Sequence, residues 1–247
     1  MKKRIFSMLL LLSCFTIVPN YINASQPSNM TIHINTSTQK GKNPYFEYEI
    51  AYPKFSGIPD KQFQQKLNHY YKKKTHHFKK KLEKDAKMYY EAAKESDAHF
   101  LPYNATVDYK VTLNKAPLLS LYVNYYQYTG GAHGMYEWKA ATLDVNQKKL
   151  LHLEDLFKEG SNYDKIVREE MARQIKQNET MYFPDATDKV MSEKKLKYFL
   201  EKDNLVIYFP LYEIAPYASG IPQFPIPYTL LIEELKPEYK KILLDNS

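Results

Sequence analysis

The sequence predicts an α+β protein of two related modules, each a helix packed on an antiparallel sheet. Apolar residues spaced by fours and sevens indicate a long amphipathic helix over 61–94. Alternating apolar and polar residues over 105–145 indicate a meander of strands joined by short turns. A second helix pattern at 161–177 and a hairpin pattern at 198–209 repeat this order. We therefore predict modules over 25–145 and 146–247.

Residues 1–24 have the composition of a signal peptide. A basic start at residues 1–4 precedes an uncharged apolar stretch, and Ala24 ends a plausible cleavage site. Two alternatives stay open: lipid attachment at Cys14, and an uncleaved anchor, although the apolar stretch is short for a membrane span. Cleavage would remove the single cysteine, and export without disulfides is typical of bacteria. We predict a secreted or cell-envelope protein, with no membrane span in the mature chain.

The first module is predicted to begin with an edge strand at 31–36 and a second strand at 45–52 that Pro53 ends. The helix of 61–94 contains eleven lysines against three acidic residues, a net charge of +8, whereas the whole mature chain has 32 basic and 28 acidic residues. Two interpretations of this basic face stay open. It is either a solvated lysine surface or a surface attracted to anionic polymers or membranes.

The second module is predicted to start its helix with a capping box at Ser161 and Asp164. Residues 178–192 look irregular, and the chain is expected to end in a polar tail after 228–235. The stretch 210–228 contains five prolines, which exclude it from a central strand, and it is too apolar for a disordered linker. We predict an ordered loop packed on the body.

A glycine-rich turn lies between two predicted strands. Three of the seven glycines of the chain fall within residues 130–134, and aromatic residues flank them on both sides. Glycine allows positive φ and close backbone approach, so the spot is either a tight turn, a packing site or a ligand site. The 23 tyrosines of the chain suit half-buried sheet surfaces and binding faces alike.

Two stretches together resemble a known exported domain pair of unknown function. One is Tyr-Gln-Tyr-Thr-Gly-Gly-Ala-His at 126–133, followed by Leu-Glu-Asp-Leu-Phe at 153–157; the other is Phe-Pro-Leu-Tyr-Glu-Ile-Ala-Pro-Tyr-Ala-Ser-Gly-Ile-Pro at 209–222. The pair occurs in the lysozyme-sensing anti-sigma factor RsiV and ahead of the catalytic domain of the peptidoglycan deacetylase PdaC. The resemblance covers about 30–240. It implies a sensor or binding module without the cytoplasmic sigma-binding part or the deacetylase domain.

The sequence contains no recognisable catalytic motif. His-Glu-x-x-His, Gly-x-Ser-x-Gly and phosphate-loop patterns are missing, and the histidines lack metal-ligand spacing. We therefore predict no catalytic residue, no metal site and no cofactor. His133 is the one candidate worth weighing: it either fixes the turn, contributes to a ligand site or, least favoured, catalyses. The predicted ligand-binding residues cluster at the two family-like stretches: Tyr128, Gly130, Gly131, His133, Tyr212 and Tyr217.

The leading hypothesis is a non-catalytic binding or sensing module at the bacterial cell envelope. Its predicted ligand is peptidoglycan or a lysozyme-like hydrolase. One alternative is a cell-wall glycan hydrolase or deacetylase with an unrecognised site. Another is a structural envelope protein that its lysine-rich helix holds to anionic polymers. Nucleic acid is excluded as a partner by the predicted export and by a positive charge that lysine, not arginine, supplies. The glycine turn is expected to find its partner in the proline-rich loop at 210–228.

Overall fold

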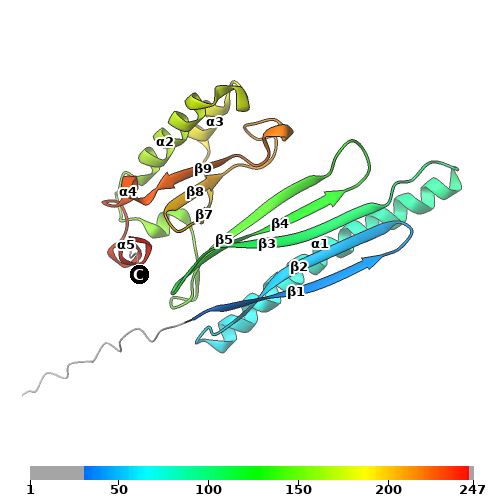
Figure 1. The fold of residues 1–247 in the computed structure, drawn as a ribbon, viewed down its shortest axis with the longest axis horizontal. Helices are drawn as coiled ribbons and strands as arrows, with labels where there is room; N and C mark the ends of the chain where they lie inside the picture. The colour runs from blue at the N-terminus through cyan, green and yellow to red at the C-terminus, as the bar shows by residue number, and fades with distance from the viewer. Residues whose placement is uncertain (1–30, 245–247) are drawn as a thin grey trace, which may run out of the picture.

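The computed structural model describes residues 31–244. The predicted signal peptide and Cys14 lie outside these residues. Each of the two sheets is packed against helices, and Figure 1 shows the long helix α1 (Lys61–Glu95) running along the first sheet, with α2 (Tyr163–Gln177) and α3 (Ala186–Ser192) beside the second. The predicted α+β class is confirmed. Within the described part of the chain, no helix is long and apolar enough to cross a membrane.

The first sheet has six strands in sequence order. They are β1 (His33–Lys42), β2 (Phe46–Ser56), β3 (Tyr103–Lys115), β4 (Leu118–Tyr128), β5 (Met135–Asp144) and β6 (Lys149–Leu151). All neighbours are antiparallel except β2 and β3, which pair in parallel. The sheet is thus mixed where an antiparallel one was predicted, because α1 returns the chain to the starting end of β2 before β3 begins. β6 pairs with β5, so this sheet extends beyond residue 145.

Pro53 does not end β2, contrary to the prediction. β2 continues to Ser56 and pairs with β1 from Glu47 to Ser56, whereas its pairing with β3 covers only Phe46–Ile50. Pro53 therefore lies in a half of the strand that has one neighbour, where a missing N–H is tolerated.

The helix α1 is stabilised at its start and along its buried stripe. The carboxylate of Asp60 caps the helix by accepting a hydrogen bond from the backbone N–H of Phe63 at 2.8 Å. Thr75 interrupts the apolar stripe, and its hydroxyl donates to the carbonyl of Tyr71 at 2.8 Å, which satisfies this buried polar group. The stripe packs mainly on β2 and β3.

The second sheet is antiparallel, with β8 in its centre. Its strands are β7 (Lys197–Leu200), β8 (Asn204–Tyr208) and β9 (Gln223–Pro227). Short helices surround it: η1 (Leu153–Leu156), η2 (Glu179–Met181), η3 (Tyr217–Ser219), α4 (Tyr228–Leu231) and α5 (Pro237–Leu244). The prolines of β9 are accommodated because β9 is an edge strand.

Three sequence predictions for this module were wrong. The stretch 178–192 contains η2 and α3, and the expected polar tail forms α5, whose Tyr239 and Leu243 are buried. The N-cap of α2 is Asn162, not Ser161, and the Ser161 hydroxyl has no hydrogen-bond partner among the described residues. Asp164 instead accepts a hydrogen bond from the Nε of Arg168 at 2.7 Å.

Side chains of both modules share one core. Leu113, Leu118 and Leu151 from the first sheet belong to the cluster that α2, α3 and the second sheet enclose. A second contact brings the aromatic face of β4 and β5 against the second sheet, where the ring centroids of Tyr122 and Phe199 lie 5.4 Å apart and those of Trp138 and Tyr208 lie 5.9 Å apart. The two sheets therefore hold one another in a fixed arrangement.

Candidate functional site

The glycine turn between β4 and β5 contains two residues with left-handed backbone. Gly130 and Gly131 have φ of +89° and +95°, a region that favours glycine, and open space surrounds the position of a Cβ at each. The hydroxyl of Tyr128 donates to the carbonyl of Gly131 at 3.0 Å and closes the turn. Backbone conformation explains these two glycines without a ligand.

The turn meets the proline-rich loop, as the sequence predicted. The ring of His133 stacks on the ring of Tyr217 with centroids 3.9 Å apart and an angle of 21°. The Tyr217 hydroxyl donates to the carbonyl of Gly134 at 2.8 Å, and the Tyr212 hydroxyl lies 3.3 Å from Nε2 of His133. We call these four residues the clasp. Rings this close are in van der Waals contact, so a ligand has no space between them.

Gly134 is required by packing. A Cβ at this position would lie 2.3 Å from the ring of Tyr126, far inside van der Waals contact. The pKa of Tyr217 is raised by desolvation and by the neighbouring tyrosines Tyr136, Tyr126 and Tyr212. Its hydroxyl therefore stays protonated at neutral pH and can donate to Gly134.

The clasp does not assemble a recognisable catalytic group. The hydrogen bonds of His133 reach the carbonyl of Gly134 and the hydroxyl of Tyr212, and the structure shows no carboxylate oriented on its ring within 31–244. Across the same residues, no group of three or more His, Cys, Asp or Glu side chains is placed to hold a metal ion. The clasp thus has the geometry of a structural contact between the glycine turn and the proline-rich loop. A ligand-binding role for its residues stays a prediction.

An open groove lies elsewhere, between α1 and β5. Since α1 packs mainly on β2 and β3, with Val123 of β4 buried in the same core cluster, part of the same face of β5 lines an open space. Two adjoining cavities of about 480 and 550 Å³ occupy this space and share Tyr70, Tyr71, Ala140 and Ala141. The small side chain of Ala141 deepens the floor, whereas that of Ala140 points to the opposite face of β5 and packs toward the second sheet. We call this continuous feature the α1–β5 groove.

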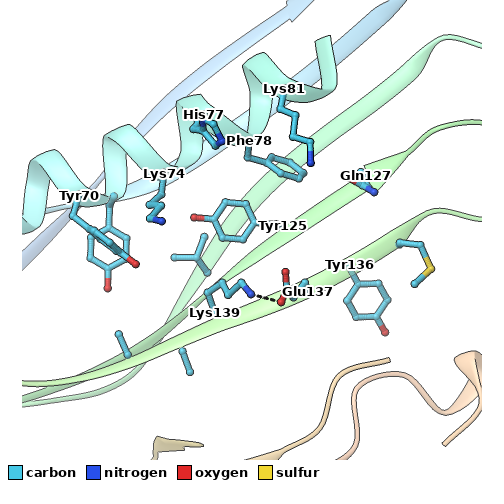
Figure 2. Close-up of a pocket in the computed structure, with 15 residues that line it drawn as sticks. Tyr70, Lys74, His77, Phe78, Lys81, Tyr125, Gln127, Tyr136, Glu137 and Lys139 are labelled. Carbon is cyan, nitrogen blue, oxygen red and sulfur yellow. Dashed lines mark hydrogen bonds and ion pairs between the residues drawn. The ribbon is translucent and has the colours of Figure 1, made fainter. Parts of the chain in front are cut away.

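Figure 2 shows the side chains on the two sides of the groove. One wall is a face of α1, from which Tyr70, Lys74 and Lys81 project toward the sheet. The floor comes from the strands, with Tyr125 on β4 and Lys139 on β5. Tyr70 is 52% exposed, which is high for an aromatic side chain, and so presents its ring to solvent. The groove therefore combines aromatic rings with cationic groups.

The carboxylates of the groove are already paired. Glu137 forms an ion pair with Lys139, and Asp60 forms one with Lys148 at 2.6 Å. The hydrogen bond from Lys148 lowers the pKa of Asp60, and that from the Phe63 N–H adds to the effect.

Two of the tyrosines that line the groove, Tyr71 and Tyr125, stay neutral. Burial raises the pKa of Tyr125 to about 12, and burial likewise raises the pKa of Tyr71. These two tyrosines therefore add no negative charge at neutral pH.

Sequence reasoning did not find this groove. It treated the lysines of 61–94 as one basic face and placed the ligand site at the glycine turn. A signal was present, because Lys66, Tyr70, Lys74, His77 and Lys81 recur every three or four positions and must share one face of the helix. The strands that form the floor could not be inferred from helix periodicity.

Two family models match the chain in succession. The family described as deacetylase PdaC matches residues 39–136, and the protein of unknown function DUF3298 matches residues 154–229. The first match covers α1 and the glycine turn, and the second covers the proline-rich loop. The clasp therefore joins the two matched regions.

Two curated proteins of Bacillus subtilis are similar to this chain. It is 26% identical over 214 residues to the peptidoglycan-N-acetylmuramic acid deacetylase PdaC, an alignment that covers 84% of the chain and 42% of the deacetylase. It is 26% identical over 192 residues to the anti-sigma-V factor RsiV, covering 72% of the chain and 62% of that protein. The chain thus spans less than two thirds of the length of either relative.

Solved structures show the same fold. A DUF3298 family protein of Bacteroides fragilis superposes with a TM-score of 0.67 at 20% identity, over 88% of this chain and 99% of the other. A DUF3298 family protein of Pseudomonas aeruginosa superposes with a TM-score of 0.56 at 20% identity, over 86% and 97%. By sequence match and by fold, this chain carries the domain pair formed by a PdaC-type N-terminal domain and a DUF3298 domain.

Proposed function

We propose that this protein is a non-catalytic binding module of the bacterial cell envelope, and that its α1–β5 groove binds a cell-wall polymer. The observation that carries the proposal is the groove itself, an open channel bounded by the half-exposed ring of Tyr70 and by lysines. Ligand sites combine an apolar concave surface with a few polar groups that fix orientation. An open groove with these features suits a long polymer that passes through it.

The relatives support a ligand in the cell wall. The name of PdaC describes a peptidoglycan deacetylase, and the aligned region covers 42% of that protein. A shared module that binds the wall would keep such a protein beside its substrate. Export of this chain through residues 1–24 belongs to the proposal, because the groove can meet a wall polymer only outside the cytoplasm.

An enzymatic role has less support from the geometry. A general base needs a position within hydrogen-bond reach of a reacting group, and His133 is held between Tyr217, Tyr212 and the Gly134 carbonyl. Release of acetate or reducing ends from peptidoglycan, lost in His133→Ala, would favour the hydrolase or deacetylase alternative.

A lysozyme-like hydrolase remains the alternative ligand. Lysozyme is basic, and the groove carries more cations than anions, so electrostatic complementarity places such a partner on another surface. Binding of lysozyme that Tyr70→Ala leaves unchanged would support a separate protein-binding surface.

Co-sedimentation with purified, insoluble cell walls tests the proposal. Tyr70→Ala removes the exposed ring of the groove, and Tyr89→Ala is a matched control because Tyr89 lies on the same helix, is 56% exposed and does not line the groove. Loss of one aromatic ring on which a nucleic-acid base stacks costs about 1–3 kcal/mol, and the lower end of this range serves as the reference for a ring that contacts a wall polymer. We therefore expect Tyr70→Ala to bind at least about fivefold more weakly, a factor that corresponds to about 1 kcal/mol.

A second variant tests the same groove by filling it. Ala141→Trp places a large ring on the floor without changing any charge. It should also reduce sedimentation, and circular dichroism would verify that it folds. Equal sedimentation of the parent, Tyr70→Ala and Ala141→Trp proteins would overturn the proposal.

A further inference from the structure

Three lysines of α1 form a row along the groove. Lys66 lines one of the two adjoining cavities, Lys74 and Lys81 line the other, and all three side chains are exposed. Their spacing of eight and seven residues keeps them on one face of the helix. We call them the lysine row. Tyr70 lies between Lys66 and Lys74, and the Nζ of Lys74 lies 5.7 Å from its ring centroid.

The charge of the lysine row is not neutralised by the protein. The two carboxylates of the groove, Glu137 and Asp60, pair with Lys139 and Lys148. Within residues 31–244, the lysine row forms no ion pair at all. Because each of these two ion pairs has no net charge, the net charge of the groove comes from the three lysines of the lysine row.

The length of the row indicates the shape of the ligand. Lys66 and Lys81 are separated by fifteen positions of an α-helix, which corresponds to about 22 Å at 1.5 Å per residue. A single small anion could contact only one part of such a row. Lysine is also a compact point charge without the fork with which arginine grips a carboxylate in two places. The row therefore suits regularly repeated anions along a flexible chain.

We infer that the α1–β5 groove binds a linear phosphodiester polymer, such as a polyol phosphate attached to the cell wall. Phosphodiesters remain ionised throughout the pH range of growth and accept point-charge contacts from lysine in several orientations. The ring of Tyr70 then packs against the apolar parts of the repeating unit. This inference rests on the proposed function and names the component of the wall that the groove recognises.

Two sets of lysine variants, on two faces of the same helix, distinguish binding at the lysine row from attraction to the positive charge of α1 as a whole. The triple variant Lys66→Gln, Lys74→Gln and Lys81→Gln removes the lysine row. The control Lys72→Gln, Lys73→Gln and Lys80→Gln removes the same charge from exposed lysines that do not line the groove. Glutamine and lysine have similar helix propensities, so both variants should keep α1 folded.

The ligands are intact walls that carry the phosphodiester polymer and the same walls after the polymer has been extracted. We expect the row variant to bind intact walls about tenfold more weakly than the parent, since three exposed charge contacts at roughly 0.5 kcal/mol each give that factor. The control variant should stay within about twofold of the parent. Binding to intact walls should also weaken as sodium chloride rises to about 1 M, where the Debye length falls to about 3 Å.

The two proposals fail in different ways. Equal binding to intact and extracted walls, with the row variant equal to its control, would overturn the phosphodiester inference; if Tyr70→Ala still reduced binding, the proposed function would stand and peptidoglycan itself would be the ligand. Absence of any Tyr70-dependent binding to either wall preparation would overturn the proposed function.

Discussion

The rings of His133 and Tyr217 stack 3.9 Å apart and join the turn between β4 and β5 to the loop that precedes β9. Each residue belongs to a different one of the two matched domains. The contact is reinforced by the hydrogen bond from Tyr217 to the Gly134 carbonyl. A motif that the sequence offered as a turn, a packing site or a ligand site is thus part of the connection between two sheets.

A double-mutant cycle should detect this connection. We predict that His133→Ala and Tyr217→Leu each lower the free energy of unfolding, with a coupling energy of about 1 kcal/mol between them, the usual range for a stacked ring pair. Urea unfolding of the parent, both single variants and the double variant measures it. Tyr212→Phe is a control that removes only the 3.3 Å contact and should cost less. Strictly additive effects would contradict the stack as an energetic contact.

Alanine substitutions at Gly134 and Gly131 should each destabilise the protein, but for different physical reasons. Gly134→Ala places a methyl group against the Tyr126 ring, and we predict a loss of about 1–3 kcal/mol from overpacking. Gly131→Ala meets open space, and its cost comes from the backbone at φ +95°.

A Tyr126→Ala background separates the two causes. We predict that it relieves most of the Gly134→Ala penalty and leaves the Gly131→Ala penalty unchanged. Chemical denaturation of the three single variants and of the two double variants that contain Tyr126→Ala measures the differences. A Gly134→Ala penalty that persists without the Tyr126 ring would contradict the packing explanation.

Asp60, the N-cap of α1, should make the stability of the protein depend on pH in the acid range. The folded-state pKa of Asp60 lies below its ordinary value of 3.8, chiefly because of the hydrogen bond from Lys148. The stabilisation is therefore present above this value and is lost as the pH falls through the folded-state pKa. We predict that Asp60→Asn, which retains a capping side chain, is less stable than the parent at pH 7, and that this difference shrinks below pH 3.8.

Lys148→Gln provides the reciprocal test, because it removes the same ion pair from the other side. Its deficit at pH 7 should disappear over the same acid range. Thermal unfolding across pH 2.5–7 measures both variants. Deficits that do not change with pH would show that the ion pair does not contribute to stability.

The C-terminal helix α5 should contribute strongly to the core. Leu243 is buried in the cluster of the second module, although the sequence suggested a polar tail. We predict that Leu243→Ala destabilises the protein by about 2–5 kcal/mol, as buried leucines do. Leu230→Ala is the control, because Leu230 is 46% exposed, and it should change stability by less than about 0.5 kcal/mol. Similar values for both variants would contradict a structural role for α5.

Much of the fold could be predicted from local patterns. The stripe of α1, the strands on either side of the glycine turn and the β7–β8 hairpin each produce a periodicity in the sequence. The short helices were missed because they leave few periods to observe. For α5 a signal existed, since Pro237 at the first helical position is typical of a helix start.

The candidate site was only partly predictable, since its parts meet through tertiary packing. The contact between the glycine turn and the proline-rich loop was predicted correctly, because both stretches belong to one family resemblance. The groove escaped prediction because its floor depends on how far α1 extends across the sheet, and α1 is placed by the parallel pairing of β2 and β3.

Binding isotherms of Tyr70→Ala and His133→Ala on purified cell walls, measured side by side, test the central claim most directly. If the α1–β5 groove is the binding surface and the clasp is structural, Tyr70→Ala should bind at least about fivefold more weakly. His133→Ala should bind like the parent at a temperature where both are folded. Loss of binding in His133→Ala with Tyr70→Ala unchanged would contradict the account and return the site to the glycine turn.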